Sequence, residues 1–402
     1  MAGRLRRAVT CASIFFILSA TPGLGAGFDL YDQNFDLLFR DGNVIEVGAT
    51  YHAPLRKVSA ARASHPITGL GVAGGLGGVF TSDLARPIGR AKFEVGSFGD
   101  CQISYQSPFG GGVSYDAGWV GRYHIISADI RTDDVSAACK VDVTRGAYVF
   151  SLIAGGRGEW MSSEATRAVA VAPGFDGLSV TKADSFGLGY DVGFAVSRPE
   201  FAFRFSAIYH SRIDHELKGT QTVATPFGPP VAFPVTWDFV TPATLDLAVE
   251  TGLARTLLGH LRLRFVDYSP LGTVTVFNAA TGLPIGRDVL GFADTWSISV
   301  GVTKLVNEKL ALDFTVGYDP DPAGPATRGP TNTVSSYVFG ALSGSYAVSE
   351  RVRLNGSLRA IRFLPTSMNI TDPTLGPTPA TYVAETGSDY GLSGSMWVSV
   401  SF

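Results

Sequence analysis

Hydrophobic and polar residues alternate along most of this chain. The segment 201–217 begins with apolar side chains at every second position, and the segments 309–318 and 390–402 repeat the pattern. Successive side chains of a β-strand point to opposite faces of the sheet. Each of these segments therefore predicts a strand with one apolar and one polar face.

The length of these segments separates a soluble β-protein from a membrane barrel. Strands of soluble domains peak near about 5–6 residues, whereas a tilted strand needs about 9–11 residues to cross a bilayer. Here the alternation often persists beyond that length, and short turns follow it, for example at 144–146, 306–308 and 347–350. Long Pro- and Gly-rich segments separate the other strand ends, and we expect them to be outer loops: 160–183, 219–233, 319–332 and 365–385. Short turns at one end and long loops at the other are typical of outer-membrane barrels.

We therefore predict an all-β protein, a transmembrane antiparallel β-barrel of about fourteen strands with long extracellular loops and a short N-terminal segment. The polar face of each strand cannot meet lipid, so it must line a closed interior. The expected strands lie near 43–53, 88–96, 100–108, 133–143, 147–159, 185–197, 201–218, 235–252, 259–276, 291–305, 309–319, 333–346, 351–363 and 388–402.

Composition removes the main alternatives. Of 402 residues, 45% are hydrophobic and only 17% are charged, and glycine occurs 48 times. A helical membrane protein needs apolar runs of about 18 residues or more, and no such run follows the first 30 residues. The formal net charge of −3 gives no basic excess that would attract nucleic acid.

The N-terminus predicts export. Three arginines within residues 4–7 precede the apolar stretch 8–20, and small residues follow at 22–26. This order is typical of a secretory signal peptide. We divide the chain into a signal peptide at 1–25, a short N-terminal segment at 26–42 and the barrel at 43–402. The short segment could enter the lumen or lie at its periplasmic mouth.

Two cysteines of the mature chain, Cys101 and Cys139, form an even pair in an oxidising compartment. Cys101 starts the third expected strand, and Cys139 lies near the periplasmic end of the fourth. Antiparallel neighbours place both side chains on the apolar face near the periplasmic rim, where a cross-strand pair can meet disulfide geometry. The pattern predicts a disulfide, with two buried thiols as the alternative.

The order of these features resembles the FadL family of outer-membrane transporters for long-chain fatty acids and other hydrophobic compounds. The resemblance begins at Ala26-Gly27-Phe28. It is better in the second half, where 206–219 and 294–301 are similar to the seventh and tenth strands and 318–322 to the loop after the eleventh. It implies a monomeric transporter among outer-membrane lipids. The terminal Phe402 resembles the signal that the barrel assembly machinery recognises.

One feature departs from the family. Its members usually carry a longer N-terminal hatch with an Asn-Pro-Ala motif, whereas here only 26–42 precedes the first strand and the motif is absent. The plug must be shorter or built otherwise, for example from the Gly-rich segment 67–80.

Two expected outer loops are unusually apolar. Phe175 and Leu178 lie in 160–183, and Phe227 and Phe233 lie in 219–233. Exposed apolar patches mark binding sites, and in the resembled family the corresponding loops form a groove that first captures the substrate. We therefore take these four residues as candidates for capture. The alternative is that the two loops pack on each other as a lid.

Alternation also places a set of arginines in the lumen beside apolar side chains. Such a mixture suits an amphipathic carboxylate, with a guanidinium on the head group. The alternative is an internal salt-bridge network that braces the barrel. Continued past residue 210, the same alternation assigns Arg212, Asp214 and Glu216 to the lumen. The candidate lumen residues are Arg204, Arg262, Arg264, Arg353, Arg359 and Trp397.

The third expected strand contains Pro108 followed by Gly110 and Gly111. Proline has no N–H for the ladder and is confined in sheets to edges, strand starts and bulges. A closed barrel has no edges, so Pro108 predicts a local gap in pairing, and glycines let the backbone bend. In the resembled family the third strand has a kink through which substrate leaves the lumen into the bilayer. The alternative is that the strand ends at Ser107 and an outer loop begins.

Other chemistry finds little support. Residues 69–74 match G-x-G-x-x-G, but that motif binds dinucleotides only between a strand and a helix of a parallel sheet. His210 and His215 are five positions apart, which on one strand puts them on opposite faces and excludes a shared metal. No G-x-S-x-G elbow occurs. We expect no cofactor, no metal and no enzymatic activity.

The sequence thus predicts passive uptake of hydrophobic small molecules, long-chain fatty acids first, across the outer membrane of a Gram-negative-type bacterium. A general diffusion porin and a lipid-hydrolysing barrel enzyme are the alternatives.

Overall fold

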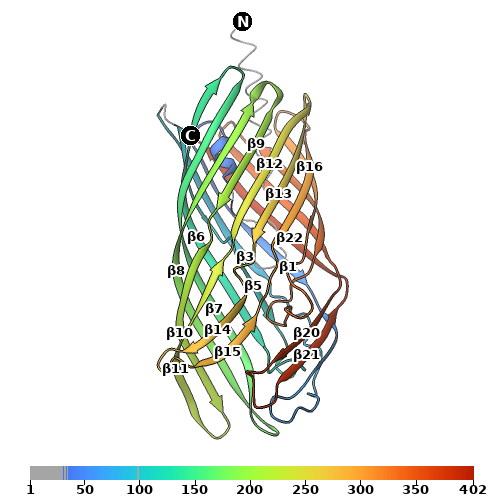
Figure 1. Cartoon of the computed structure of the whole chain (residues 1–402). Coiled ribbons are helices and arrows are strands. Elements are labelled where there is room, and N and C mark those ends of the chain that lie inside the picture. Colours follow the sequence, from blue (N-terminus) through green and yellow to red (C-terminus); the bar gives the residue numbers. More distant parts are fainter. Residues whose placement is uncertain (1–29, 31–32, 34, 97–98) are drawn as a thin grey trace.

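The computed structural model describes residues 30, 33, 35–96 and 99–402, so the expected signal peptide at 1–25 lies outside the described residues. The chain forms a closed antiparallel β-barrel of 14 strands (Figure 1), which confirms the predicted fold class. The barrel closes because β1 pairs with β22 on one side and with β3 on the other. None of the described helices is long and apolar enough to span a bilayer.

The strands are β1 (Val44–Leu55), β2 (Val58–Ala63), β3 (Leu84–Val95), β4 (Gly99–Gln106), β5 (Gly110–Ser114), β6 (Ser127–Arg145), β7 (Tyr148–Ala172), β8 (Phe175–Arg198), β9 (Phe203–His210), β10 (Ile213–Thr225), β11 (Gly228–Thr241), β12 (Ala243–Ala254), β13 (Leu257–Asp267), β14 (Thr273–Asn278), β15 (Pro284–Val289), β16 (Thr295–Leu305), β17 (Leu310–Asp319), β18 (Tyr337–Ala347), β19 (Val352–Phe363), β20 (Thr366–Asp372), β21 (Ala380–Thr386) and β22 (Asp389–Ser401). Two short 3-10 turns, η1 (Asp36–Phe39) and η2 (Pro199–Phe201), complete the described elements.

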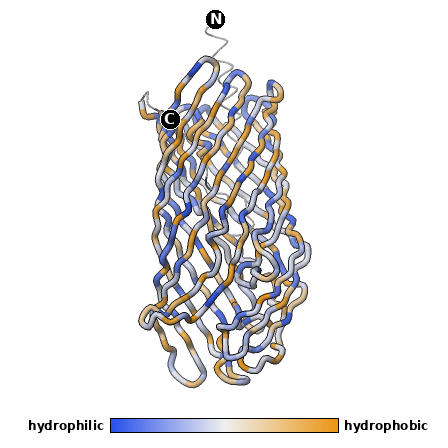
Figure 2. Tube along the Cα trace, viewed as in Figure 1, coloured by the Kyte–Doolittle hydropathy of each residue, from blue (hydrophilic) through white to orange (hydrophobic). Residues whose placement is uncertain are grey.

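The wall alternates between two chemistries, as the tube in Figure 2 shows. On β22, Leu392, Met396 and Val398 are exposed on the outside, whereas Ser393 and Ser395 are buried inside. The exposed apolar side chains form the surface that lipid covers, and the buried polar side chains line the interior. The period-two pattern in the sequence is therefore the alternation between lipid and lumen.

The end of the barrel that carries the C-terminus has short turns, whereas β11, β20 and β21 lie at the opposite end (Figure 1). We assign that opposite end to the cell exterior, because outer-membrane barrels keep their long connections there. There β20 pairs with β21 and β21 with β2, in a separate three-stranded sheet.

Three of the four segments that we expected to be outer loops form strands instead, so these three predictions are wrong. Segment 160–183 is the tip of the β7–β8 hairpin, and 219–233 is the tip of the β10–β11 hairpin. Segment 365–385 contains β20 and β21. The apolar residues that interrupt these segments alternate along extended strands, and Gly174 at φ 81° supplies the tight turn. Only 319–332 is free of strand beyond its first residue.

Three barrel strands are interrupted within the wall, giving the pairs β4/β5, β9/β10 and β11/β12. The break after His210 inverts the alternation, so that Arg212, Asp214 and Glu216 are exposed outside the barrel. The prediction that these three face the lumen is therefore wrong. His215 is buried inside the barrel, as His210 is, and their expected placement on opposite faces is wrong for the same reason.

Candidate functional site

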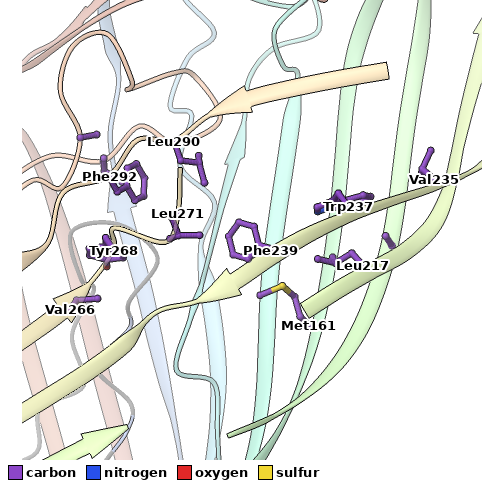
Figure 3. Close-up of a cluster of buried hydrophobic side chains, with 13 residues drawn as sticks. Met161, Leu217, Val235, Trp237, Phe239, Val266, Tyr268, Leu271, Leu290 and Phe292 are labelled. Atoms are coloured by element: carbon purple, nitrogen blue, oxygen red, sulfur yellow. The ribbon is translucent and has the colours of Figure 1, made fainter. Parts of the chain in front are cut away.

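An apolar cavity of about 220 Å³ lies inside the outer half of the barrel. Its wall comes from β6, β7, β8, β10 and β11 and from the β14–β15 hairpin, with Trp237 and Phe239 of β11 among the large side chains. The buried cluster drawn in Figure 3 continues from these two residues to Met161 and Leu217. Most small-molecule sites are concave and mainly apolar with few polar groups, and this cavity has that character.

A few polar groups enter the cavity. Gln221 Nε2 donates to Ser179 Oγ over 2.6 Å, and Thr331 Oγ1 donates to Asp288 Oδ2 over 2.8 Å. Burial raises the pKa of the Asp288 carboxyl, and Asp372 brings a second carboxyl group to the cavity wall. Burial lowers the pKa of His124 from 6.5 to about 4, so this imidazole is neutral at pH 7.

Arg167 of β7 brings a positive charge to the same cavity. Within the described part of the chain its guanidinium forms no salt bridge shorter than 4.0 Å, although the carboxyl groups of Asp372 and Asp288, which line the same cavity, interact with it electrostatically. A guanidinium can hold a carboxylate through two parallel hydrogen bonds. The cavity therefore combines an apolar wall with one cation that has two acids nearby, Asp372 and Asp288, but forms no direct salt bridge with either.

The four candidate capture residues lie above the cavity on the two outer hairpins. Phe175 and Phe227 are 51% and 64% exposed, and their ring centroids are 5.3 Å apart. Leu178 is exposed on β8, whereas Phe233 is partly buried and packs against the cavity cluster. The inner faces of the same hairpins contribute Ser179 and Gln221 to the cavity wall, so the tips and the cavity share their strands.

The candidate arginines of the lumen fall into two groups. Three of them, Arg204, Arg262 and Arg264, meet acids and the N-terminal segment in the inner half. Arg204 bonds Glu250 at 3.0 Å, and Arg264 bonds Asp246 at 2.5 Å. These pairs fit the alternative of an internal salt-bridge network that braces the barrel. They do not leave the three arginines available for the head group of a substrate.

Arg353, Arg359 and Trp397 lie elsewhere on the inner face. Arg359 is buried over the ring of Phe339 at 4.1 Å, while Arg353 and Trp397 are half-buried on β19 and β22. None of the six candidates lines the outer cavity.

The N-terminal segment enters the lumen. Asp36 of η1 accepts from Arg262 at 2.5 Å and from Arg204 at 3.2 Å, and the Gln33 oxygen accepts from Arg264 at 3.0 Å. Burial favours the neutral acid at Asp36, but the positive charges of the two arginines outweigh it and hold the pKa of this carboxyl below its usual value. The sequence left two placements open for the N-terminal segment, inside the lumen or at its periplasmic mouth. The structure places its described residues inside the lumen.

The wall is interrupted at Pro108. β4 ends at Gln106, β5 resumes at Gly110, and both pair with β6, so the alternative of a strand that ends in an outer loop is wrong. Residues 84–88 of β3 have register partners in β1, and the described pairs with β4 begin only at Gly89. Leu30 of the N-terminal segment donates its N–H to the Pro108 carbonyl over 2.8 Å.

Cys101 and Cys139 are directly opposed on β4 and β6 and joined by a disulfide in the structure. Their neighbours Ile103 and Val141 are exposed on the lipid-facing side. The pair thus fixes β4 to β6 on the periplasmic side of the Pro108 interruption.

Sequence reasoning missed the cavity itself. Trp237, Phe239 and Arg167 point inward from the extracellular ends of their strands. Arg167 also lies in segment 160–183, which we expected to be a loop. The available signal was the alternation, which continues through 161–168. Among the described residues, no group of three or more His, Cys, Asp and Glu side chains is arranged to hold a metal ion.

Comparisons with known proteins agree with this architecture. Residues 97–355 match the model of a family described as outer membrane protein transport protein (OMPP1/FadL/TodX). No curated protein matches the sequence. A Pseudomonas aeruginosa FadL homologue superposes with a TM-score of 0.84 at 17% identity, over 94% of this chain and 100% of that one.

Two further solved structures share the fold at lower similarity. The toluene transporter TodX of P. putida matches with a TM-score of 0.62 at 14% identity, over 95% of this chain and 99% of that one. The CymD monoaromatic hydrocarbon channel matches with a TM-score of 0.60 at 13% identity, over 94% and 95%. Since the family model covers more than half of the sequence, this chain belongs to the OMPP1/FadL/TodX family of outer-membrane transport proteins.

Proposed function

We propose that this protein mediates passive uptake of hydrophobic small molecules across the outer membrane, with long-chain fatty acids as the substrate class. The observation that carries the proposal is Arg167 in the apolar cavity. An acyl chain would fill the apolar space, and its carboxylate would meet the guanidinium. A hydrocarbon without a head group, such as the substrates named for the TodX and CymD structures, would have no use for this cation.

The route starts at the hairpin tips. Phe175, Leu178, Phe227 and Phe233 would capture the solute and pass it along the shared hairpins into the cavity. The ion pairs of Arg204, Arg262 and Arg264 make the inner half unsuitable for an apolar chain, because opening them would expose buried charges. An exit through the wall at Pro108, Gly110 and Gly111 avoids that region. In this scheme the N-terminal segment acts as a short hatch.

The test compares Arg167→Gln with the unmodified barrel in equilibrium binding of oleate and of toluene. Hydrogen bonds to charged groups contribute about 1.5–3 kcal/mol, so oleate affinity should fall by at least roughly tenfold. Toluene affinity should stay the same. Arg212→Gln, at an exposed arginine outside the barrel, is the matched control. Equal oleate affinity in Arg167→Gln and wild type would contradict the head-group assignment.

Two measurements separate transport from the alternatives. A porin would raise ion and sugar conductance in planar bilayers, and a lipid-hydrolysing enzyme would release fatty acid from phospholipid. A transporter would do neither, yet it would restore growth on oleate to an uptake-deficient host. Mass spectrometry of ligands that co-purify with the barrel would identify the substrate directly.

The exit at Pro108 has its own test. A Gly110→Trp, Gly111→Trp variant should lower uptake while surface binding survives. Because Gly110 has φ 154° and a Cβ there would lie 2.7 Å from Arg86, Gly111→Trp alone serves as the milder variant. Normal uptake by either folded variant would rule out this exit.

A further inference from the structure

One corner of the outer cavity is polar. Four segments of the chain contribute one side chain each: Arg167 of β7, Asp288 of β15, Thr331 between β17 and β18, and Asp372 of β20. These four residues form the polar corner of the cavity. The apolar lining continues on the β11 side into the buried cluster drawn in Figure 3. A ligand that fits this cavity therefore has an apolar body and a polar end.

Arg167 lies close to Asp288 within the polar corner. A Cβ added to Gly286 would lie 4.0 Å from Arg167 Nη2, so the guanidinium approaches a position of β15 that has no side chain. Side chains alternate across a strand, and Gly286 and Asp288 therefore share one face of β15. The guanidinium and the Asp288 carboxyl interact electrostatically, yet no direct salt bridge joins them. Both line the same cavity, so a ligand can reach the two groups together.

The polar corner has hydrogen-bonding capacity that the protein itself leaves unused. Thr331 donates to Asp288 Oδ2 over 2.8 Å, and Thr374 donates its N–H and its hydroxyl to Asp372 Oδ1 over 2.7 and 2.6 Å. Among the described residues, no donor bonds to Asp288 Oδ1 or Asp372 Oδ2, and no acceptor bonds to the Arg167 guanidinium. Carboxyl oxygens accept hydrogen bonds and a guanidinium donates them. A complementary head group therefore offers both an acceptor and a donor.

A plain fatty acid meets only half of this requirement. Its carboxylate accepts from Arg167, but an ionised carboxylate has no hydrogen to donate to Asp288 or Asp372. It also brings one more acidic group toward two others, which like-charge repulsion opposes. A site with hydrogen-bonding groups for a hydroxyl discriminates against the analogue that lacks it, because the polar groups of the site are then left unpaired. A hydrocarbon leaves all of these groups unpaired.

We propose that the polar corner selects fatty acids that carry a hydroxyl group close to the carboxylate. Arg167 holds the carboxylate, Asp288 and Asp372 accept from the hydroxyl, and the acyl chain lies along the apolar lining. This proposal rests on the proposed function and deepens it by naming the substrate class. Because Arg167 and Asp288 flank the same space, a hydroxyl on the third carbon matches the site, whereas one at the far end of the chain does not.

Three probes of equal chain length test this selection. They are 3-hydroxyhexadecanoate, hexadecanoate, and 16-hydroxyhexadecanoate, which carries its hydroxyl at the opposite end. Equilibrium binding of each probe to the full barrel is measured in detergent. Because a hydrogen bond to a charged group changes affinity by about tenfold or more, 3-hydroxyhexadecanoate should bind at least about tenfold more tightly than the other two probes.

Substitution of the two acids locates the hydroxyl. Asp288→Ala with Asp372→Ala should lower the affinity for 3-hydroxyhexadecanoate to that for hexadecanoate, and each single variant should lose part of the preference. Asp288→Asn keeps an acceptor oxygen and should retain more of the preference than Asp288→Ala. Asp238→Ala removes an exposed carboxyl of β11 outside the cavity and is the matched control. Heat resistance on gels verifies that each variant is folded.

The outcomes separate this inference from the proposed function. Equal affinity of the wild-type barrel for the three acids, together with weaker binding of all three by Arg167→Gln, overturns the hydroxyl selection alone. A preference for 3-hydroxyhexadecanoate that survives in the double alanine variant overturns the role of Asp288 and Asp372. Absence of binding of all three acids overturns the proposed function and this proposal with it.

Competition gives a second measurement that does not depend on the absolute affinity of a variant. The barrel is incubated with an equimolar mixture of the three acids and washed, and chromatography with mass spectrometry determines the ratio of the acids that remain bound. We expect 3-hydroxyhexadecanoate to dominate in the wild type and in Asp238→Ala, and to lose this advantage in the double alanine variant. An even ratio in the wild type would overturn the selection.

Discussion

The inner and outer halves of the lumen belong to the same barrel wall, yet the arginines in the two halves make different contacts. In the inner half, Arg204 lies between Asp36 and Glu250, and Arg264 lies between Asp246 and Gln33. In the outer half, Arg167 enters an apolar cavity where Asp372 and Asp288 lie near it but neither forms a direct salt bridge with it. The difference teaches that the contacts of a lumen arginine decide its role. An arginine bonded directly to an acid braces the barrel, whereas one without a direct salt bridge can still bind a ligand.

Removing a bracing arginine should have the largest effect on stability. Arg204→Ala leaves Glu250 buried without its partner, which should lower the free energy of unfolding by about 3–5 kcal/mol. Arg212→Ala breaks an exposed pair with Asp214 and should cost about 0–1 kcal/mol. Urea unfolding in detergent measures both. Similar losses for the two variants would end the distinction between bracing and surface arginines.

The disulfide should make the next largest contribution, again to the inner half. Cys101→Ser with Cys139→Ser should lower the free energy of unfolding by about 2–4 kcal/mol and leave oleate binding in the outer cavity unchanged. Maleimide labelling of the wild type after denaturation should require reductant. Equal labelling with and without reductant would show that the bond does not form.

Acid should weaken the outer half through His124. Its pKa is lowered by burial from 6.5 to about 4, so the unfolded chain binds this proton more readily between those values. The free energy of unfolding should therefore fall by roughly 3 kcal/mol as the pH drops from above 6.5 to 4. His124→Gln should remove that part of the pH dependence. An unchanged pH profile in the variant would place the acid sensitivity elsewhere.

The smallest effect concerns capture. Phe175→Ser with Phe227→Ser removes an exposed aromatic pair, whose contribution of about 0.5–1.5 kcal/mol corresponds to roughly threefold to tenfold in affinity. Oleate binding should weaken by that factor. The barrel should stay heat-resistant on gels, because neither side chain supports the sheet. Undiminished binding in the double variant would assign capture to other residues.

The fold was predictable because lipid and lumen impose a strict period of two. All fourteen expected barrel strands correspond to strands of the structure, including 333–346, which overlaps β18. The disulfide pairing followed from the same geometry, since Cys101 and Cys139 are opposed in adjacent strands.

The site was less predictable because one extra residue inverts the alternation. The chain has seven residues at 211–217 facing six at 185–190, so Arg212 leaves the lumen and His215 enters it. Pro242 in the neighbouring strand was a visible mark of this break. The pairing of Arg204 and Arg262 with Asp36 depends on how the N-terminal segment folds back, which a pattern along the chain does not contain.

The unbroken length of the β7–β8 hairpin determines how far its tip stands from the bilayer. At about 3.3 Å per residue, the 25 residues of β7 extend roughly 80 Å along the strand. At a tilt of about 40° and with an apolar band of about 25 Å, roughly 30 Å or more stands clear of the hydrocarbon. Phe175 therefore lies in the hydrated layer outside the bilayer, and capture at this position would shorten the distance that a sparingly soluble molecule has to diffuse through water.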